Sequence, residues 1–353
     1  MFRFDLKYAP LKFKRPSGTS RGILTEKQAW YVTLSSSESE IHGTGEISII
    51  PGLTKEFDTL ESYNNWLETC IYELNSAELN EKNYLEFIDR WADKPSLFFG
   101  LETAYYDFIA GGKQLFFDTP FTRKETGIPV NGLIWMGDEI YMKEQISEKL
   151  QEGYSCIKMK IGAIDFETEI KLLKVIRENY PKDQITLRVD ANGAFSLSEA
   201  PEKLKQLADL EIHSIEQPIK AGDWEGMYLL CKSTPCPIAL DEELIGIYDW
   251  ASKKELLTTI QPQYIILKPS LHGGIKGCQE WINLAASLSI PWWITSALES
   301  NVGLNAITQF VSNYEPVLHQ GLGTGSLYVE NTVPTTVIRN GKMFFTGIDA
   351  EDR

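Results

Sequence analysis

From about Ile128 onward, short apolar runs alternate with longer windows in which apolar residues recur every three or four positions. The short runs, such as CIKMKI, ITLRVDAN, PIALDEE and YIILKPS, predict buried strands. The longer windows, such as Phe166–Glu178 and Leu197–Ala208, predict amphipathic helices. This strand–helix unit recurs eight times, with a period of roughly 25–30 residues. The alternation predicts a parallel sheet of the α/β class, and eight units favour a (β/α)₈-type TIM barrel.

Residues 1–125 follow a different pattern, in which strands come first and helices follow. Strands are predicted at Phe2–Phe13 and Ala29–Ser35, and helices at Leu60–Leu74, Leu85–Trp91 and Leu101–Ala110. Strands and helices that are segregated in this way indicate an α+β unit.

Three further segments are predicted from their polar and glycine content. Arg15–Arg21 (RPSGTSR) is longer than a tight turn requires and predicts a mobile loop within the opening hairpin. Gly43–Glu46 predicts a turn before another strand. After Tyr328 the chain returns to strand character, with Asn340 and Gly341 as a tight turn. We therefore expect an α+β capping domain of residues 1–125, completed by the tail 328–353, on a barrel domain of residues 126–327.

The composition is that of an ordinary soluble globular protein, with 43% hydrophobic and 24% charged residues. A formal net charge of −15 argues against nucleic-acid binding, because an acidic surface repels phosphate backbones. No leader and no apolar run of membrane-spanning length is present, so we expect a cytoplasmic location. The five cysteines form no CxxC pair, which is typical of core thiols and gives no support to a zinc site.

Carboxylates close three successive predicted strands. Asp190, Glu216 and Asp241 are spaced by 26 and 25 residues, which is one strand–helix unit in each case. In a parallel barrel such strand ends meet at the mouth where active sites lie. Three converging carboxylates repel one another unless a cation neutralises them, and oxygen-only ligands favour Mg²⁺. The spacing therefore predicts a magnesium site, which Mn²⁺ could also occupy.

Lysines end the strands on either side of the three acids. Lys158 and Lys160 share one face of the first flanking strand, and Lys268 ends the other. Neighbouring ammonium groups beside a cation lower each other's pKa, which makes a lysine usable as a general base. A single acid after a strand is usually a helix N-cap, and a single lysine is usually a surface charge. It is the five strand-end groups, taken together, that predict proton abstraction next to a carboxylate held by the metal ion.

The motifs KMK, DANG, EQP, DEE and LKPSLHGG resemble, in this order, the muconate-lactonizing-enzyme subgroup of the enolase superfamily. The segments FFGLETA, IPVNGL, TSALESNVGLN and HQGLGT are similar to the o-succinylbenzoate synthase family of menaquinone biosynthesis. This resemblance covers nearly the whole chain. It implies a lyase that removes water from 2-succinyl-6-hydroxy-2,4-cyclohexadiene-1-carboxylate, so the expected partner is a small carboxylate substrate.

The resemblance also implies roles for the strand-end residues. Asp190, Glu216 and Asp241 would be the metal ligands, Lys160 the acid/base and Lys268 the opposing cation on the other face of the ring.

Weaker candidates for substrate contact accompany these residues. Lys158 would support Lys160, and Asn192 would orient water on the metal. The remaining candidates lie in the last two strand ends or in the N-terminal loop: Ser296, Gly321, Gly323 and Arg21, with Arg15 as an alternative to Arg21.

Other reactions of the same subgroup use the same five groups. N-acylamino acid racemases, dipeptide epimerases and muconate cycloisomerases therefore remain alternatives. Dipeptide epimerases typically carry Asp-x-Asp at the eighth strand, where this chain has Gly321-Leu-Gly323. A binding protein without activity would be expected to lack one of the five groups, and none is lacking here. The oligomeric state, a homo-oligomer included, is left open.

Overall fold

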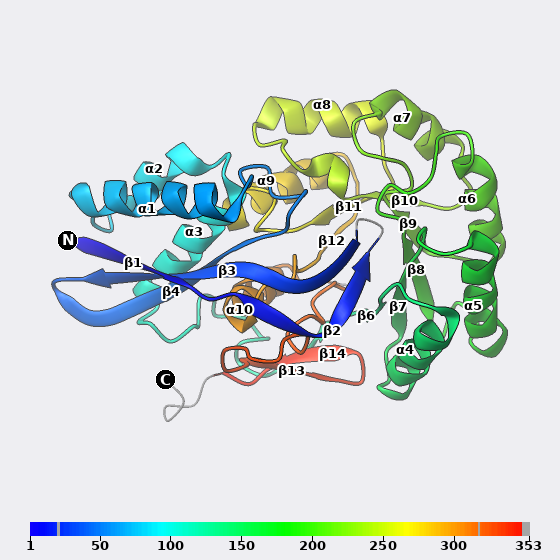
Figure 1. Ribbon diagram of the computed structural model, residues 1–353, viewed down its shortest axis with the longest axis horizontal. Helices are drawn as coiled ribbons and strands as arrows, with labels where there is room; N and C mark the ends of the chain where they lie inside the picture. Colours follow the sequence, from blue (N-terminus) through cyan, green and yellow to red (C-terminus); the bar gives the residue numbers. More distant parts are fainter. Residues whose placement is uncertain (20–21, 317, 348–353) are drawn as a thin grey trace.

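The computed structural model describes residues 1–19, 22–316 and 318–347 of the chain. An antiparallel sheet opens the chain, with β3 at its centre and β1, β2 and β4 paired to it. Its strands are β1 (Phe2–Tyr8), β2 (Leu11–Thr19), β3 (Gly22–Ser36) and β4 (Ser39–Ile49). The helices that follow are α1 (Leu60–Ser76), α2 (Tyr84–Ile88), the 3₁₀ turn η1 (Asp89–Trp91) and α3 (Pro95–Ile109). Figure 1 shows these helices beside the sheet, at the end of the molecule that holds the N-terminus.

The predicted turn at Gly43–Glu46 is wrong, because these residues lie inside β4. A Cβ atom on Gly45 would stand 1.9 Å from the carbonyl oxygen of Gly100 in α3. The glycine therefore serves close packing of helix against strand, which a single sequence does not separate from a turn.

The predicted loop at Arg15–Arg21 is largely a strand. β2 extends to Thr19 and pairs with β3, with a register shift between Lys12 and Ser17. Long polar strands of this kind lack the alternation that marks a half-buried strand, so their pairing is not visible in the sequence. The last of these residues, including Arg21, lies outside the described residues.

A seven-stranded parallel sheet follows, in the order β12-β11-β10-β9-β8-β7-β6. Its strands are β6 (Gly132–Ile134), β7 (Cys156–Lys160), β8 (Thr186–Asp190), β9 (Ser214–Glu216), β10 (Ile238–Leu240), β11 (Tyr264–Leu267) and β12 (Trp292–Ile294). The helices between and after them are α4 (Glu139–Gln151), α5 (Phe166–Asn179), α6 (Ala200–Asp209), α7 (Trp224–Ser233), α8 (Trp250–Ile260), α9 (Gly274–Ser287) and α10 (Asn301–Ser312), with the 3₁₀ turn η2 (Glu242–Leu244) after β10. In Figure 1 helices α4 to α8 form an outer layer around the strands.

The segment at Gln320 and Gly321 connects the two ends of this sheet. Gln320 forms a parallel bridge to Val130, just before β6, and Gly321 forms one to Thr295, just after β12. The amide N–H of Gly321 donates to the carbonyl of Ile294 at 2.8 Å.

The C-terminal tail divides between two neighbours. Tyr328 bridges to Phe13 of β2, which joins this part of the tail to the N-terminal sheet. The hairpin of β13 (Thr336–Arg339) and β14 (Lys342–Phe345) pairs instead with β5 (Ile128–Pro129). Its turn is the predicted one at Asn340 and Gly341, both of which have positive φ.

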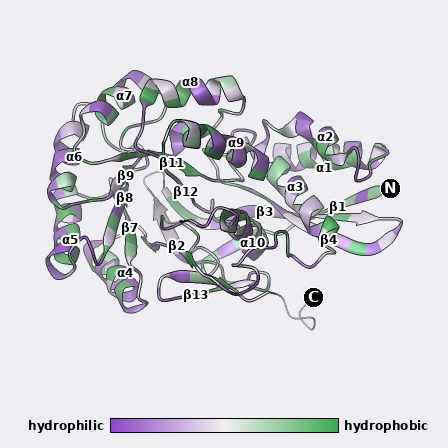
Figure 2. Cartoon of the chain, turned by 180° about the vertical axis from the view of Figure 1, so that it is seen from behind, coloured by the Kyte–Doolittle hydropathy of each residue, from purple (hydrophilic) through white to green (hydrophobic). Residues whose placement is uncertain are grey.

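Apolar side chains gather in two large clusters. One fills the space between the parallel strands and their helices and includes Phe99 of α3, and the other lies between the N-terminal sheet and α1 to α3. The helices of the parallel sheet carry hydrophobic and hydrophilic residues in alternating patches (Figure 2), as their amphipathic pattern predicts. Within the described residues, no helix combines the length and apolarity that a bilayer crossing requires.

Candidate active site

Strand pairing brings the predicted residues to one level of the sheet. Lys160 is in register with Asp190, and Asp190 is in register with Glu216. Asp241 follows β10, the next strand along, and Lys268 follows β11. The ends of five adjacent parallel strands therefore carry the five groups, as the spacing predicts.

Together with Lys158, their side chains form a row of acids and lysines in close contact. The Nζ of Lys158 lies 2.9 Å from Asp190 Oδ2 and 2.5 Å from Glu216 Oε2. The Nζ of Lys160 lies 3.0 Å from the same Asp190 oxygen. At the other end of the row, Lys268 donates to Asp241 Oδ2. All six side chains are at least nine-tenths buried.

Burial and the mutual charges shift the pKa values of these groups. Burial and the nearby Asp190 raise the pKa of Glu216 well above its ordinary range, although Lys158 opposes this. Burial alone would lower the pKa of Lys158, but Asp190 and Glu216 outweigh it, and the net pKa is raised. Lys268 behaves in the same way beside Asp241. Lys158 and Lys268 each contact carboxylates more closely than another amine. The lowering expected for paired amines beside a metal ion stays a prediction.

The acids retain oxygen atoms that no protein group satisfies. Glu216 Oε1 and Asp241 Oδ1 are buried and have no hydrogen-bond partner. Among the described residues no three acidic, histidine or cysteine side chains stand close enough to hold a metal ion as they are placed. The Lys158 ammonium group lies between Asp190 and Glu216 instead. Buried acceptor-only oxygens beside neutralising cations nevertheless fit a hard divalent ion, because such an ion takes oxygen ligands and replaces the missing partners.

A cavity of about 220 Å³ opens next to this row. Lys158, Lys160, Asp190, Glu216 and Lys268 line it, whereas Asp241 lies behind Lys268 and is fully buried. The N-terminal part of the chain supplies another wall with residues of β3 and of the segment after β4: Gly22, Ile23, Leu24, Ile50, Pro51 and Leu53. The site is therefore shared between the N-terminal sheet and the parallel sheet.

Asn192 holds Lys160 in place. Its Oδ1 accepts from Lys160 Nζ at 2.9 Å, and its Nδ2 donates to Glu242 Oε1 at 2.9 Å. Its backbone is left-handed, with φ of 45°, and its amide N–H donates to Asp190 Oδ1. These contacts add a positioning role to the predicted one of orienting water.

The predicted residues Ser296, Gly321 and Gly323 all line the cavity. The Ser296 hydroxyl already donates to Glu299 Oε2 at 2.6 Å and accepts from Thr324 Oγ1 at 2.8 Å. The amide N–H of Gly321 is used in the sheet, and a Cβ there would stand 2.4 Å from Thr295 Oγ1. Gly321 thus provides space, not a hydrogen bond.

The structure does not place Arg15 or Arg21 beside the row of acids and lysines. Arg21 lies outside the described residues. Arg15 is exposed on β2 and lines a second, neighbouring cavity.

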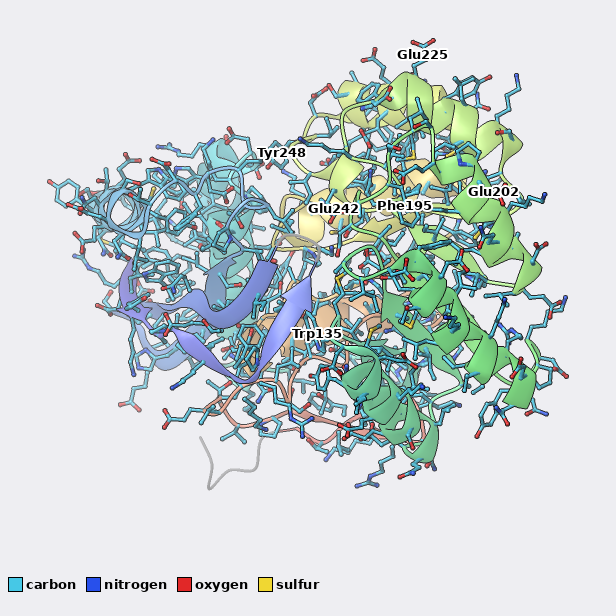
Figure 3. The ribbon with its side chains drawn as sticks, turned by 45° about the vertical axis from the view of Figure 1, so that its right-hand side comes forward. Trp135, Phe195, Glu202, Glu225, Glu242 and Tyr248 are labelled. Carbon is cyan, nitrogen blue, oxygen red and sulfur yellow. The ribbon has the colours of Figure 1, made fainter. Side chains whose placement is uncertain are left out.

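Sequence reasoning missed the apolar walls of the cavity. Leu133 and Trp135, at and just after the end of β6, line it together with Leu298. Trp135 also packs with Leu11, Phe13 and other residues at the base of the β2–β3 hairpin, and Figure 3 shows it where that hairpin meets the parallel sheet. The only signal in the sequence is that these residues lie at or just after strand ends. Apolar residues of the core occupy such positions too, so the position alone does not mark a cavity wall.

Comparison with known proteins gives a consistent result. The family described as enolase C-terminal domain-like matches residues 141–345. An o-succinylbenzoate synthase from Desulfotalea psychrophila (strain LSv54 / DSM 12343) is 46% identical over 369 residues, covering 97% of this chain and 99% of that protein. The crystal structure of MenC from Desulfotalea psychrophila LSv54 has a TM-score of 0.84 at 40% identity, covering 97% of this chain and 99% of that one.

A substrate-liganded L-Ala-D/L-Glu epimerase from Bacillus subtilis also has a TM-score of 0.84, at 19% identity, covering 98% of this chain and 96% of that chain. This second likeness shows the fold alone, so the fold does not choose between dehydration and epimerisation. Near-complete coverage at 46% identity does distinguish the families. The chain belongs to the o-succinylbenzoate synthase family of the enolase superfamily.

Proposed function

We propose that this chain is an o-succinylbenzoate synthase, a Mg²⁺-dependent lyase of menaquinone biosynthesis. Its substrate would be 2-succinyl-6-hydroxy-2,4-cyclohexadiene-1-carboxylate and its products 2-succinylbenzoate and water. The observation that carries this proposal is the row of three buried carboxylates with lysines at both ends, beside one cavity. Membership of the family supports the choice of substrate.

The proposal includes the architecture that holds the site. We infer that the parallel bridges of Gln320 and Gly321 complete a (β/α)₈-type barrel of residues 126–327. Residues 1–125 would form the α+β capping domain, to which the tail contributes Tyr328. The buried, unpaired state of all five cysteines supports a reducing, cytoplasmic location.

Asp190, Glu216 and Asp241 would hold the metal ion, for which the buried, unpartnered oxygens of Glu216 and Asp241 are suited. When bound, Mg²⁺ supplies positive charge that stabilises the negative charge developing on the substrate carboxylate as the α-proton leaves. Mn²⁺ is expected to replace it, because both ions prefer oxygen ligands in octahedral geometry.

Lys160 would move the proton. Its Nζ lines the cavity and is oriented by Asp190 and Asn192. As a neutral amine it takes the proton from the carbon next to the ring carboxylate. The ammonium group so formed returns that proton to the departing hydroxyl group on the same face. The C–H and C–O bonds break, a ring double bond forms, and the hydroxyl leaves as water.

Lys268 would act by charge from the opposite end of the row. Its ammonium group faces the cavity and is held by Asp241. Over the face of the ring it stabilises the anion and attracts the aromatic product by cation–π interaction. Lys158 would neutralise Asp190 and Glu216 and keep both side chains at the strand ends.

The direct test offers the purified protein several substrates in the presence of Mg²⁺. The cyclohexadiene carboxylate should be converted to an aromatic product, followed by its absorbance. A parallel panel of dipeptides and N-acylamino acids should show much slower epimerisation, monitored by exchange of the α-proton with deuterated water. Rapid exchange in the panel together with no aromatic product would overturn the proposal in favour of a racemase or epimerase.

A further inference from the structure

Gln217 directly follows Glu216 at the end of β9 and is fully buried. It is not among the described residues that line the cavity, so it does not face a substrate. Its backbone is left-handed, with φ of 41°, although it carries a side chain. A non-glycine residue in this conformation costs free energy and is kept where the surrounding contacts hold it there.

The side chain of Gln217 is hydrogen-bonded to the segment after β10. Its Oε1 accepts from the amide N–H groups of Asp241 and Glu243, each at 3.2 Å. Its Nε2 donates to Glu243 Oε2 and to the carbonyl oxygen of Ile219, each at 3.0 Å. Glu243 is held in turn, because its Oε1 accepts from the amide N–H of Gly222 at 2.8 Å. Both the oxygen and the nitrogen of the Gln217 side chain are therefore used within the protein.

The backbone of Gln217 joins the neighbouring strands on both sides. Its carbonyl oxygen accepts from the amide N–H of Gly193 at 2.7 Å, in the loop that follows Asp190. Its own amide N–H donates to a carbonyl group of β10 at 3.0 Å. Through its own hydrogen bonds, this one residue links the three strand ends that carry Asp190, Glu216 and Asp241.

We propose that Gln217 is a positioning residue, which holds the three carboxylates close enough together to share one divalent cation. This inference rests on the proposed function, which assigns Asp190, Glu216 and Asp241 to Mg²⁺. Carboxylates repel one another, so in the metal-free protein the segment after β10 moves away from β9 unless a hydrogen bond holds it. Partners that orient metal ligands in this way commonly change metal affinity by about 10- to 100-fold.

Calorimetric titration of the metal-free protein with Mg²⁺ tests this role without any substrate. Gln217→Met keeps an unbranched side chain of similar length, so the strain of the left-handed backbone is similar. The variant loses all the hydrogen bonds of the side chain, including the one to the Asp241 amide. It should bind Mg²⁺ about 10- to 100-fold more weakly than the parent protein.

Gln263 is the matched control, because it makes the same kind of link at the opposite end of β10. Its Oε1 accepts from the Ile238 amide N–H, and its Nε2 donates to the Cys231 carbonyl, both at 2.9 Å. Gln263→Met should lower the Tm of the metal-free protein, as Gln217→Met does, because both leave amide groups unpaired. Its Mg²⁺ affinity should change by less than about 3-fold.

Exchange of the two hydrogen-bonded side chains provides a rescue. In Gln217→Glu combined with Glu243→Gln, a carboxylate at position 217 still accepts from both amide N–H groups after β10. The new side-chain amide at position 243 donates to that carboxylate, the net charge is unchanged, and the bond to Ile219 is lost. Mg²⁺ affinity should return to within about 3-fold of the parent value.

Mg²⁺ affinity that stays within about 3-fold of the parent value in Gln217→Met would contradict the positioning role. The same holds for equal weakening by Gln263→Met, which would indicate general loosening of the strands. An exchange variant that folds but binds Mg²⁺ about 10-fold or more weakly would also overturn the inference, and it decides the matter if Gln217→Met does not fold. These outcomes leave the proposed function intact, whereas absence of Mg²⁺ binding by the parent protein would overturn both.

Discussion

Lys158 and Lys160 lie two positions apart on β7, and their surroundings differ. Lys158 contacts two carboxylates, which hold it as an ammonium ion. Lys160 shares Asp190 and takes its other contact from the neutral Oδ1 of Asn192. Lys160 therefore contacts one carboxylate where Lys158 contacts two. The period of two along the strand predicts their common face, whereas their separate roles are implied by the family resemblance.

Replacement of Lys160 tests this assignment. Lys160→Ala should lower the dehydration rate by about 10²–10⁴-fold, the usual contribution of a positioned acid/base, while Mg²⁺ binding remains measurable by calorimetry. Lys205→Ala, an exposed lysine on α6, should retain full activity. Undiminished turnover by Lys160→Ala would remove Lys160 as the base.

His319 gives the fold a dependence on pH. Burial and the nearby charge of Arg188 lower its pKa to about 4, below the ordinary value near 6.5. The unfolded chain therefore takes up a proton below about pH 6.5, whereas the folded protein resists until about pH 4. Stability from this group is present above pH 6.5 and is lost as the pH falls through that window. His319→Gln should flatten the decrease in Tm between pH 7 and 4.5. The slope should decrease without vanishing, because His213, whose pKa is also near 4, remains in the variant. An unchanged slope would contradict the assignment.

At the scale of elements, two carboxylates of the N-terminal part cap helices of the parallel sheet. Glu46 of β4 accepts from the amide N–H groups of Ser300 and Gly303, both at 2.9 Å, at the start of α10. Glu102 of α3 accepts from Ile275 and Lys276 at the start of α9. Carboxyl oxygens at a helix N-terminus accept hydrogen bonds from the free N–H groups of the first turn. Because α9 and α10 follow β11 and β12, these contacts tie the two parts together behind Lys268 and Ser296.

Removal of one such cap should reduce both stability and activity. Glu46→Ala leaves buried N–H groups unpaired and should lower the free energy of unfolding by about 1–3 kcal/mol in urea denaturation. Activity should fall as well, since the contact holds the segment that carries Ser296. Glu202→Ala, an exposed glutamate on α6 (Figure 3), is the matched control and should have almost no effect. Equal stability of the two variants would show that the contact is dispensable.

Elements whose pattern is local could be predicted from the sequence, and those fixed by long-range packing could not. Helix α5 begins at Phe166, as its periodicity predicts, because Asp165 caps it by accepting from the Thr168 amide. Helix α6 begins at Ala200, three residues later than expected, because Pro201 sets its first turn. The strand character of Arg15–Thr19 depends on pairing with β3, and that partner is not encoded in the segment itself.

At the scale of the whole molecule, the sequence predicts only the side of the site that the parallel strands form. The acids and lysines follow from strand ends that recur at a fixed spacing. Pocket residues such as Ile50 and Leu53 come from the N-terminal part and have no spacing relation to the strands. The arrangement of the two parts therefore decides the shape of the cavity, and this arrangement rests on contacts such as those of Glu46 that no local pattern reveals.

The account depends on the three carboxylates holding a divalent cation that the reaction requires. The most direct measurement is the dehydration rate of protein freed of metal by EDTA, then titrated with Mg²⁺. The account predicts no turnover in excess EDTA, recovery with Mg²⁺ or Mn²⁺, and a much higher Mg²⁺ requirement in Asp241→Asn than in the parent protein. Full turnover of the cyclohexadiene carboxylate in excess EDTA would contradict it.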